Sequence, residues 1–388
     1  ASTGGQIMPP IMGAAAFLMA EYMGVTYGQV TLWAILPAVL YFGGIFISVH
    51  LEAKKLGLKG IPRSELPRFK YLIRNVYLLL PLVFLIWMVT ANIRSLQFSA
   101  AIAILISIAV SLVGTIRDAS AEVKETKTGS VAGITAKKTG RMILDSLEAG
   151  GKGSITVAVA CAMAGMIAGC ITVTGLASKL ISGVIAISSA IPNPTLSLLL
   201  ALFLTMLCCI VLGMGVPTTA NYCIMASTCA PILITLGIPK VAAHFFVFYF
   251  GIVADITPPV ALAAYAGSAI AKSNPMKTGI TATKLAIAAF IVPFIFAYNP
   301  QMLFENVTSV FQVIQIVITA LLGIFAVAAG LEGYILRTMH WPLRVLAVIG
   351  GLTLLIPGTV SDLIGLVIVA GIIALQIVQN KKAARETA

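Results

Sequence analysis

The sequence has very little charge for its length. Of its 388 residues, 10% are charged and 59% are hydrophobic, whereas a soluble domain carries about 25% charged residues. A soluble fold of this size could not cover its surface with so few charged side chains. The hydrophobic residues form blocks long enough to cross roughly 30 Å of hydrocarbon as helices. The sequence therefore predicts an all-α, polytopic membrane protein built as a helical bundle.

The sequence also lacks the usual signatures of catalysis. It contains no H-E-x-x-H, no G-x-S-x-G and no glycine-rich phosphate loop after a strand. The six cysteines lie in apolar segments without C-x-x-C spacing, which is typical of small buried hydrophobic side chains. A membrane-embedded aspartyl protease would need paired intramembrane aspartates, whereas Asp255 stands alone in this sequence. We therefore predict no enzyme activity, no catalytic residue and no cofactor.

The apolar blocks predict a series of membrane crossings. In order they are 7–27, 29–50, 76–93, 98–115 and 154–177, an apolar pair at 196–212 and 219–236, then 241–271, 283–299, 308–333, 342–357 and 361–379. Residues 178–193 are assigned to no element.

Lysine and arginine orient these crossings, because cytoplasmic loops are enriched in both. Basic residues gather in the predicted loops 51–74 and 116–153. Further basic residues lie beyond residue 271. They are Lys272, Lys277, Lys284, Arg337, Arg344, Lys381, Lys382 and Arg385. All of them share one side, with a cytoplasmic C-terminus, if 196–236 is a re-entrant hairpin and 241–271 crosses once. Counting 196–236 as one full span would place the later clusters on the opposite face unless 241–271 formed two spans, so the charges favour the hairpin without proving it.

The predicted hairpin is interrupted at its tip. Two glycines and a proline lie between residues 213 and 217 and break the helix. Such backbone persists at membrane depth against protein or a water-filled cavity. Polar residues that can ligate a cation or donate to an anion follow the break: Thr218, Thr219 and Asn221.

A second interruption lies in the apolar block 241–271. Asp255 costs about 2.5–3.5 kcal/mol at the centre of a membrane helix, so it is a functional candidate. The alternative is that Asp255 caps the half-helix beginning at Pro258-Pro259, and both roles can hold together. Glu21 is the other carboxylate well inside an apolar segment, and we interpret it as interfacial.

This interruption belongs to an internal repeat. Residues 8–15 (Met-Pro-Pro-Ile-Met-Gly-Ala-Ala) align with residues 257–264 (Thr-Pro-Pro-Val-Ala-Leu-Ala-Ala) at a constant offset, 257 − 8 = 249. The charge pattern predicts opposite orientations for the two copies. Inverted repeats with a broken helix at matching positions are typical of secondary transporters, and they favour alternating access over a channel.

Several of these stretches resemble a known family. Gly213–Tyr222, residues 242–251 and Asp255–Tyr265 are similar to the fused permease of TRAP transporters, in the TAXI branch. Thr3-Gly4-Gly5 and Met8-Pro9-Pro10 fit the first repeat of its large membrane subunit. The resemblance covers about residues 1–300, and the last three helices resemble the extension of such fused permeases.

The resemblance implies a function and partners. TRAP systems are bacterial and archaeal inner-membrane importers of organic anions, typically carboxylates, driven by a sodium or proton gradient. Their large subunit works by elevator-type alternating access. The implied partners are a periplasmic TAXI-type substrate-binding protein, a small membrane subunit portion of the same longer chain and the lipid bilayer, with no nucleic acid.

The resemblance also implies site residues. The implied ion-binding residues, where sodium could bind, are Gly213, Gly215, Thr218, Thr219, Asn221, Asp255, Ile256, Thr257, Ser2, Thr3, Gly4 and Gly5. The implied substrate-binding residues are Pro217, Thr219, Asn221, Pro9, Pro10, Pro258 and Pro259.

The domain organisation follows from the repeats. Residues 1–50 end the first inverted repeat, and 51–153 form cytoplasmic linkers and scaffold helices. Residues 154–300 form the second repeat, with the hairpin 196–236 and the broken helix 241–271, and 301–388 form a C-terminal three-helix extension. Because the first copy starts at its break, we expect an amino-terminally truncated fragment.

Overall fold

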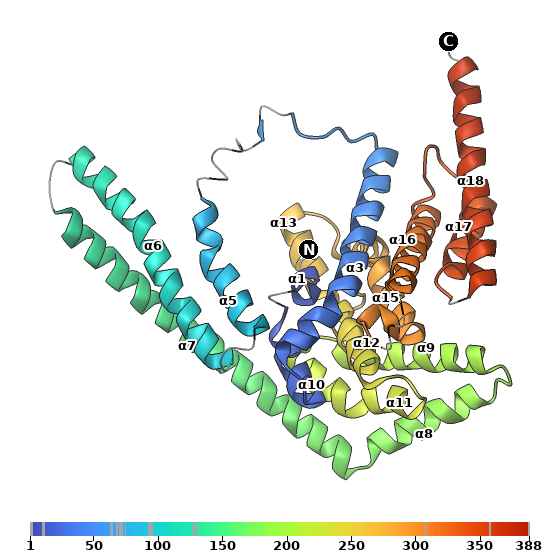
Figure 1. The fold of residues 1–388 in the computed structure, drawn as a ribbon, viewed down its shortest axis with the longest axis horizontal. Coiled ribbons are helices and arrows are strands. Elements are labelled where there is room, and N and C mark those ends of the chain that lie inside the picture. Colours follow the sequence, from blue (N-terminus) through green and yellow to red (C-terminus); the bar gives the residue numbers. More distant parts are fainter. Residues whose placement is uncertain are drawn as a thin grey trace. The chain divides into compact units, whose positions relative to one another are not determined.

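A computed structural model describes residues 3–9, 12–62, 65–66, 69, 73, 75–91, 96–126, 130–305, 307, 309–356 and 358–386. Over these residues the regular secondary structure is helical, apart from an isolated antiparallel bridge between Tyr334 and Thr338 (Figure 1). Six described helices are long and apolar enough to cross a membrane, or seven if one bent pair counts as a span. The predicted all-α, multi-pass membrane protein is therefore confirmed.

The chain divides into two compact units. The larger comprises residues 1–25, 30–59 and 163–388, and the smaller comprises residues 26–29 and 60–162.

The smaller unit contains η2 (Val76–Leu79), α5 (Leu80–Thr90), α6 (Leu96–Thr126) and α7 (Val131–Val173) up to residue 162. Helix α5 packs on α6. The prediction of a loop over 116–153 is wrong, because α6 and α7 continue through most of it. Exposed ion pairs one turn apart add a small stabilisation to the polar part of α7, Arg141 with Asp145 at 3.9 Å and Lys152 with Glu148.

The larger unit opens with the first repeat and continues through the second. Its elements up to the second break are α1 (Gly4–Ile7), α2 (Ala14–Met23), α3 (Tyr27–Lys55), α8 (Leu176–Ser189), α9 (Pro194–Gly213), α10 (Thr218–Thr228), α11 (Ala230–Thr235), α12 (Lys240–Val253) and η3 (Ala254–Ile256). The rest are α13 (Leu262–Ala271), α14 (Pro275–Leu285), α15 (Ile287–Tyr298), η4 (Pro300–Leu303), α16 (Val310–Glu332), α17 (Trp341–Thr353) and α18 (Thr359–Glu386).

Helix α8 occupies the stretch that received no element from the sequence. It follows Gly175, whose positive φ of 66° ends the preceding helix. Val184 of α8 packs with Ala201 of α9 and Ile232 of α11. Because residues 201 and 232 lie in the same cluster, α9 and α11 run side by side as the two legs of a hairpin.

The core of the larger unit is α12. Every residue from Val241 to Val253 is buried. Its aromatic rings meet those of α15 edge to face, with Phe246 and Phe294 centroids 5.5 Å apart and Tyr249 and Phe296 centroids 5.7 Å apart. The broken span therefore begins inside protein rather than against lipid.

The two aligned stretches of the predicted repeat share a local backbone conformation. Met12 and Ala261, 249 residues apart, both have positive φ, 39° and 37°. The Met12 amide donates to the Met8 carbonyl at 3.3 Å, and the Ala261 amide donates to the Thr257 carbonyl at 3.1 Å. The helices that follow, α2 and α13, each have 10 residues, about half the length that a full crossing needs.

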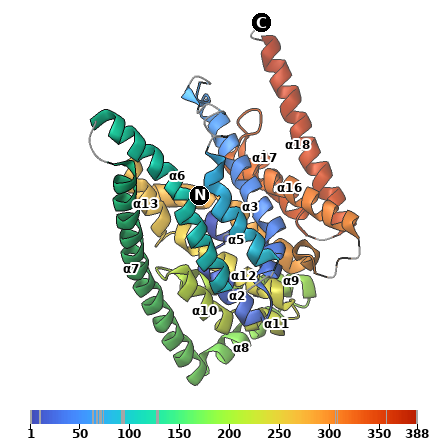
Figure 2. The ribbon, with the colours of Figure 1, turned by 60° about the vertical axis from the view of Figure 1, so that its left-hand side comes forward.

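Helices α16, α17 and α18 lie side by side in both views (Figures 1 and 2). Glycines allow their backbones to approach closely. A Cβ on Gly351 of α17 would lie 2.7 Å from the Gly323 carbonyl oxygen of α16. Packing on small residues is a common way to hold helices together in membranes.

Candidate functional site

Both predicted helix breaks are present. Helix α9 ends at Gly213 and α10 begins at Thr218, and the chain between them turns through Gly215, whose φ is 74°. After α12 comes the single 3-10 turn η3, and regular helix resumes at Leu262. The peptide bond between Pro258 and Pro259, in the second break, is cis.

The two breaks touch at Gly213. A Cβ added there would lie 2.6 Å from Asn221 Nδ2 and 2.8 Å from Ala254 Cβ. Glycine is required at this position because no larger residue would let the hairpin turn approach η3 so closely. The sequence predicted two interrupted segments, and the structure brings them together.

A cleft of about 480 Å³ lies where the hairpin turn faces the second break. It is lined by Gly215, Val216, Pro217, Thr218, Asp255, Leu262 and Ala263. Asp255, which is half-buried, carries the one charge among these lining residues. The cleft therefore combines a carboxylate, a hydroxyl and irregular backbone.

Two cleft residues, Leu262 and Ala263, were not predicted. They are aliphatic and carry no polar signal, but they begin α13, and the repeat alignment could have pointed to them. The alternative role of Asp255 as the cap of this half-helix is wrong. The N-cap of α13 is Ala261 in the left-handed conformation, and no side chain caps it.

Asn221 lies behind the cleft rather than in its lining. Its side chain is fully buried, and Nδ2 donates a hydrogen bond to the Gly251 carbonyl at 3.1 Å. Its Oδ1 atom is buried without a hydrogen-bond partner among the described residues. Buried acceptors are rarely left unpaired, so this oxygen is suited to accept a cation.

The polar groups at the second break already have protein partners. The Thr257 hydroxyl donates to the Val253 carbonyl at 2.7 Å, and the Ile256 carbonyl accepts from the Thr283 hydroxyl at 3.0 Å. The Ile256 oxygen retains a second lone pair. Thr283 of α14 was not predicted, because nothing in the local sequence links it to a residue 27 positions earlier.

The remaining predicted residues of the second copy lie around the cleft. Thr219, Pro258 and Pro259 are not among its lining residues. Thr219 and Pro258 are partly buried, and Pro259 is exposed with its carbonyl accepting from the Tyr265 hydroxyl at 2.6 Å.

The first copy forms a separate polar region. Thr3 is buried and its hydroxyl hydrogen-bonds to the Tyr41 hydroxyl at 2.7 Å. Gly4 is buried, Gly5 is exposed and Pro9 is partly buried. The predicted residues Ser2 and Pro10 lie outside the described residues.

The first break also has an unpaired amide oxygen. Gln6 Oε1 is buried without a partner among the described side chains, as is Oδ1 of Asn221 at the second break. The sequence analysis did not select Gln6. A polar residue immediately before an interrupted apolar span was the signal that could have identified it.

The two copies meet through α2. It packs against α10 and α12, and the Tyr22 and Tyr222 rings lie edge to face at 6.1 Å. The Tyr222 hydroxyl also hydrogen-bonds to His244 Nδ1 at 2.7 Å. This contact places the half-helix of the first copy directly on one leg of the hairpin.

The candidate ligands at these breaks are oxygens. In the part of the chain that the structure describes, no three His, Cys, Asp or Glu side chains are grouped to hold a metal ion. The hydroxyl, amide, carbonyl and carboxylate oxygens around the cleft suit a hard cation rather than a zinc-type metal.

Comparison with known proteins gives one family. A family model described as "Tripartite ATP-independent periplasmic transporter, DctM component" matches residues 1–307. The match includes both breaks, the hairpin and the cleft, and it ends before α16. Comparisons with curated proteins and with solved structures gave no match.

Proposed function

Because the chain belongs to the DctM family, the membrane permease components of tripartite ATP-independent periplasmic (TRAP) transporters, we propose that it imports organic anions, chiefly carboxylates. Uptake is driven by a sodium or proton gradient and proceeds by elevator-type alternating access. The protein belongs to the TAXI branch and lies in the inner membrane with its C-terminus in the cytoplasm.

The observation that carries this proposal is the cleft between the hairpin turn and the second break. Asp255 gives one side of the cleft a negative charge that attracts a cation. Leu262 and Ala263 belong to the first turn of α13, and the positive end of a helix dipole favours an anion. A cleft with both features suits the joint binding of a cation and a carboxylate.

The coupling ion binds near Asn221 in this proposal. Its unpaired Oδ1 atom supplies one ligand, and the second lone pair of the Ile256 carbonyl supplies another. Thr218 and Asp255 line the cleft through which the ion reaches these ligands. The first copy provides a related region through Thr3, Gly4 and Gly5, beside the unpaired Gln6 oxygen.

Transport requires other proteins. DctM components work with a periplasmic substrate-binding protein and a small membrane subunit. We propose that the binding protein of this system is of the TAXI type and delivers the carboxylate to the cleft.

The deciding experiment measures uptake by the complete complex in liposomes, with the binding protein supplied and radiolabelled carboxylates offered. Asp255→Asn is expected to abolish gradient-driven uptake while the protein still inserts. The matched control is Asp145→Asn, an exposed carboxylate of α7, which should leave uptake unchanged. Parent-like uptake and cation dependence in Asp255→Asn would rule out this role.

A second arm identifies the ion. Uptake is measured with a sodium gradient alone, a proton gradient alone and neither. Dependence on either gradient supports secondary transport, whereas equal uptake under all three conditions contradicts it.

A further inference from the structure

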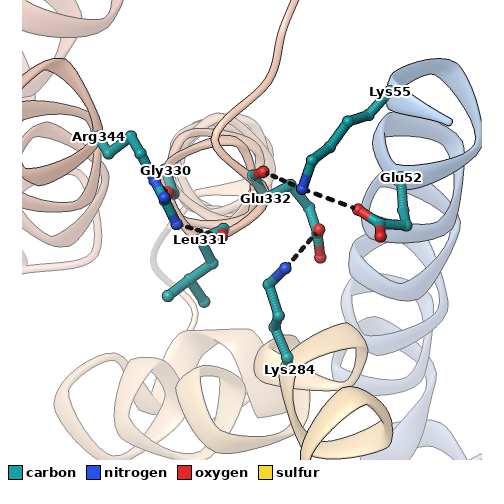
Figure 3. A network of polar contacts seen from close by, with 7 residues as sticks. All are labelled: Glu52, Lys55, Lys284, Gly330, Leu331, Glu332 and Arg344. Carbon is teal, nitrogen blue, oxygen red and sulfur yellow. Dashed lines mark hydrogen bonds and ion pairs between the residues drawn. The ribbon is translucent and has the colours of Figure 1, made fainter. Parts of the chain in front are cut away.

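Glu332, the last residue of α16, is a buried carboxylate beyond the residues that match the family model. Its side chain is 1% exposed, and its Oε2 atom lies 2.6 Å from Lys284 Nζ (Figure 3). Lys55 Nζ donates to the Glu332 backbone carbonyl at 2.9 Å and also pairs with Glu52 at 3.4 Å. Glu332 therefore joins the ends of α3, α14 and α16.

A carboxylate at this depth needs its partners. Removing a charged group from water is costly, and an opposite charge in direct contact offsets part of that cost. Lys284 makes that contact from α14, and its side chain is 34% exposed. The position of α14 is thus coupled to the position of Glu332.

The placement of Glu332 is set by α17. Arg344 donates through Nε to the Gly330 carbonyl at 2.9 Å and through Nη2 to the Leu331 carbonyl at 2.8 Å (Figure 3). These are the free carbonyls at the C-terminal end of α16. Helices α16 and α17 therefore present the carboxylate to Lys284 as one packed pair.

The residue before Lys284, Thr283, contacts the second break instead. The Thr283 hydroxyl lies 3.0 Å from the Ile256 carbonyl oxygen of η3 and 3.0 Å from the Gly279 carbonyl oxygen one turn back in α14, so its proton is shared between the two acceptors. On the same helix, a Cβ on Gly279 would lie 3.2 Å from Pro258 Cγ, so α14 packs closely along the second break. One short helix thus contacts the break and the C-terminal helices through neighbouring residues.

We infer that Glu332 is a positioning residue for the second break, acting through Lys284 and Thr283. The ion pair holds α14 in place, and α14 holds the Ile256 carbonyl in the orientation that a cation needs. The three C-terminal helices therefore set the geometry of the ion site, although none of their residues lines the cleft. The transport readout rests on the proposed function, and the labelling readout below does not.

The test uses the complete complex and a probe cysteine in the cleft, Ala263→Cys. Its labelling rate with a maleimide is followed by mass spectrometry of the peptide. Glu332→Gln and Thr283→Val are each expected to change this rate about threefold or more, a usual size for indirect coupling. Lys284→Arg, which keeps the charge, should label at a rate close to that of the parent, whereas Lys284→Gln should change the rate as Glu332→Gln does.

The same variants are assayed for transport. The half-saturating concentration of the coupling cation should rise about threefold or more in Glu332→Gln, with maximal uptake per inserted protein little changed. Asp362→Asn, a carboxylate of α18 outside this contact chain, is the matched control and should behave as the parent. If the parent complex shows no uptake but the labelling changes persist, the proposed transport function fails and the positioning role stands.

A double-variant cycle distinguishes an effect of Glu332 that passes through Thr283 from a general contribution of Glu332 to the stability of the fold. If Glu332 acts through Thr283, the variant carrying both Glu332→Gln and Thr283→Val should show no larger change than either single variant. Independent, additive changes would overturn the inference. It would also be overturned if Glu332→Gln lowered thermal stability while labelling and cation dependence stayed at parent values.

Discussion

Met12 and Ala261 occupy equivalent places in the two repeats and share a left-handed backbone conformation, although neither is glycine. This conformation costs roughly 1–2 kcal/mol for a residue with a Cβ atom. Each residue directly precedes, or lies one position from, the half-helix that follows its break. Both copies therefore have the same local cost where a helix begins again after the break.

The first prediction tests this strain. Ala261→Gly should stabilise the protein by about 1 kcal/mol, because glycine adopts positive φ without a steric penalty. Thermal unfolding of the purified protein in detergent measures the change. Ala264→Gly, within α13, is the control and should cost about 0.5–1 kcal/mol. Destabilisation of similar size by both variants would show that the conformation at Ala261 is not strained.

The second prediction concerns the contact between the breaks. Gly213→Ala should destabilise the protein by about 1–3 kcal/mol, because the new methyl group overlaps Asn221 and Ala254. It should also reduce uptake by the complete complex. Gly165→Ala in α7, where a Cβ meets nothing within 4 Å, should be neutral or slightly stabilising. Equal behaviour of the two variants would contradict the close approach at Gly213.

The third prediction addresses the unpaired oxygen of Asn221. If it ligates the coupling cation, adding that cation should stabilise the parent by about 2.7 kcal/mol at a concentration one hundred times Kd. Asn221→Ala should lose most of this cation-dependent shift in unfolding temperature. Asn193→Ala removes a different amide, the N-cap of α9, and should lower stability while keeping the shift. A full shift in Asn221→Ala would remove this residue from the ion site.

The fourth prediction concerns the membrane orientation of the hairpin. Thr195→Cys and Thr235→Cys, near the outer ends of its two legs, should react with an impermeant maleimide from the same, periplasmic face. Lys59→Cys should react from the opposite face, because basic residues favour the cytoplasm. Labelling of the two hairpin positions from opposite faces would show that α9 to α11 cross the membrane.

The helix breaks could be predicted because their causes are local. Glycine and proline at 213–217 and at 258–259 interrupt helices whatever surrounds them. The long apolar helices were predictable for the same reason, because a run of about 20 consecutive apolar residues is enough to indicate a membrane-crossing helix. Polar helix was harder to predict. The extensions of α6 and α7 contain no long apolar run that would mark them as helix, and the loop predicted there was wrong.

The contacts that shape the site could not be predicted from local sequence. Glu332 looked like an ordinary helix-end carboxylate, and its burial depends on Lys284, 48 residues earlier. Thr283 reads as one of several threonines until the fold places it against Ile256. Asp255, predicted to bind the ion, lies in the cleft lining, but the suggestion that it caps α13 failed because Ala261 takes the cap position.

The complete burial of α12 has a mechanical consequence. From Val241 to Val253 no side of the helix is left uncovered, and its rings interlock with those of α15. A helix that is packed on every side cannot slide or rotate without displacing its neighbours. We therefore expect α15 to move together with α12 in any rearrangement that displaces this helix.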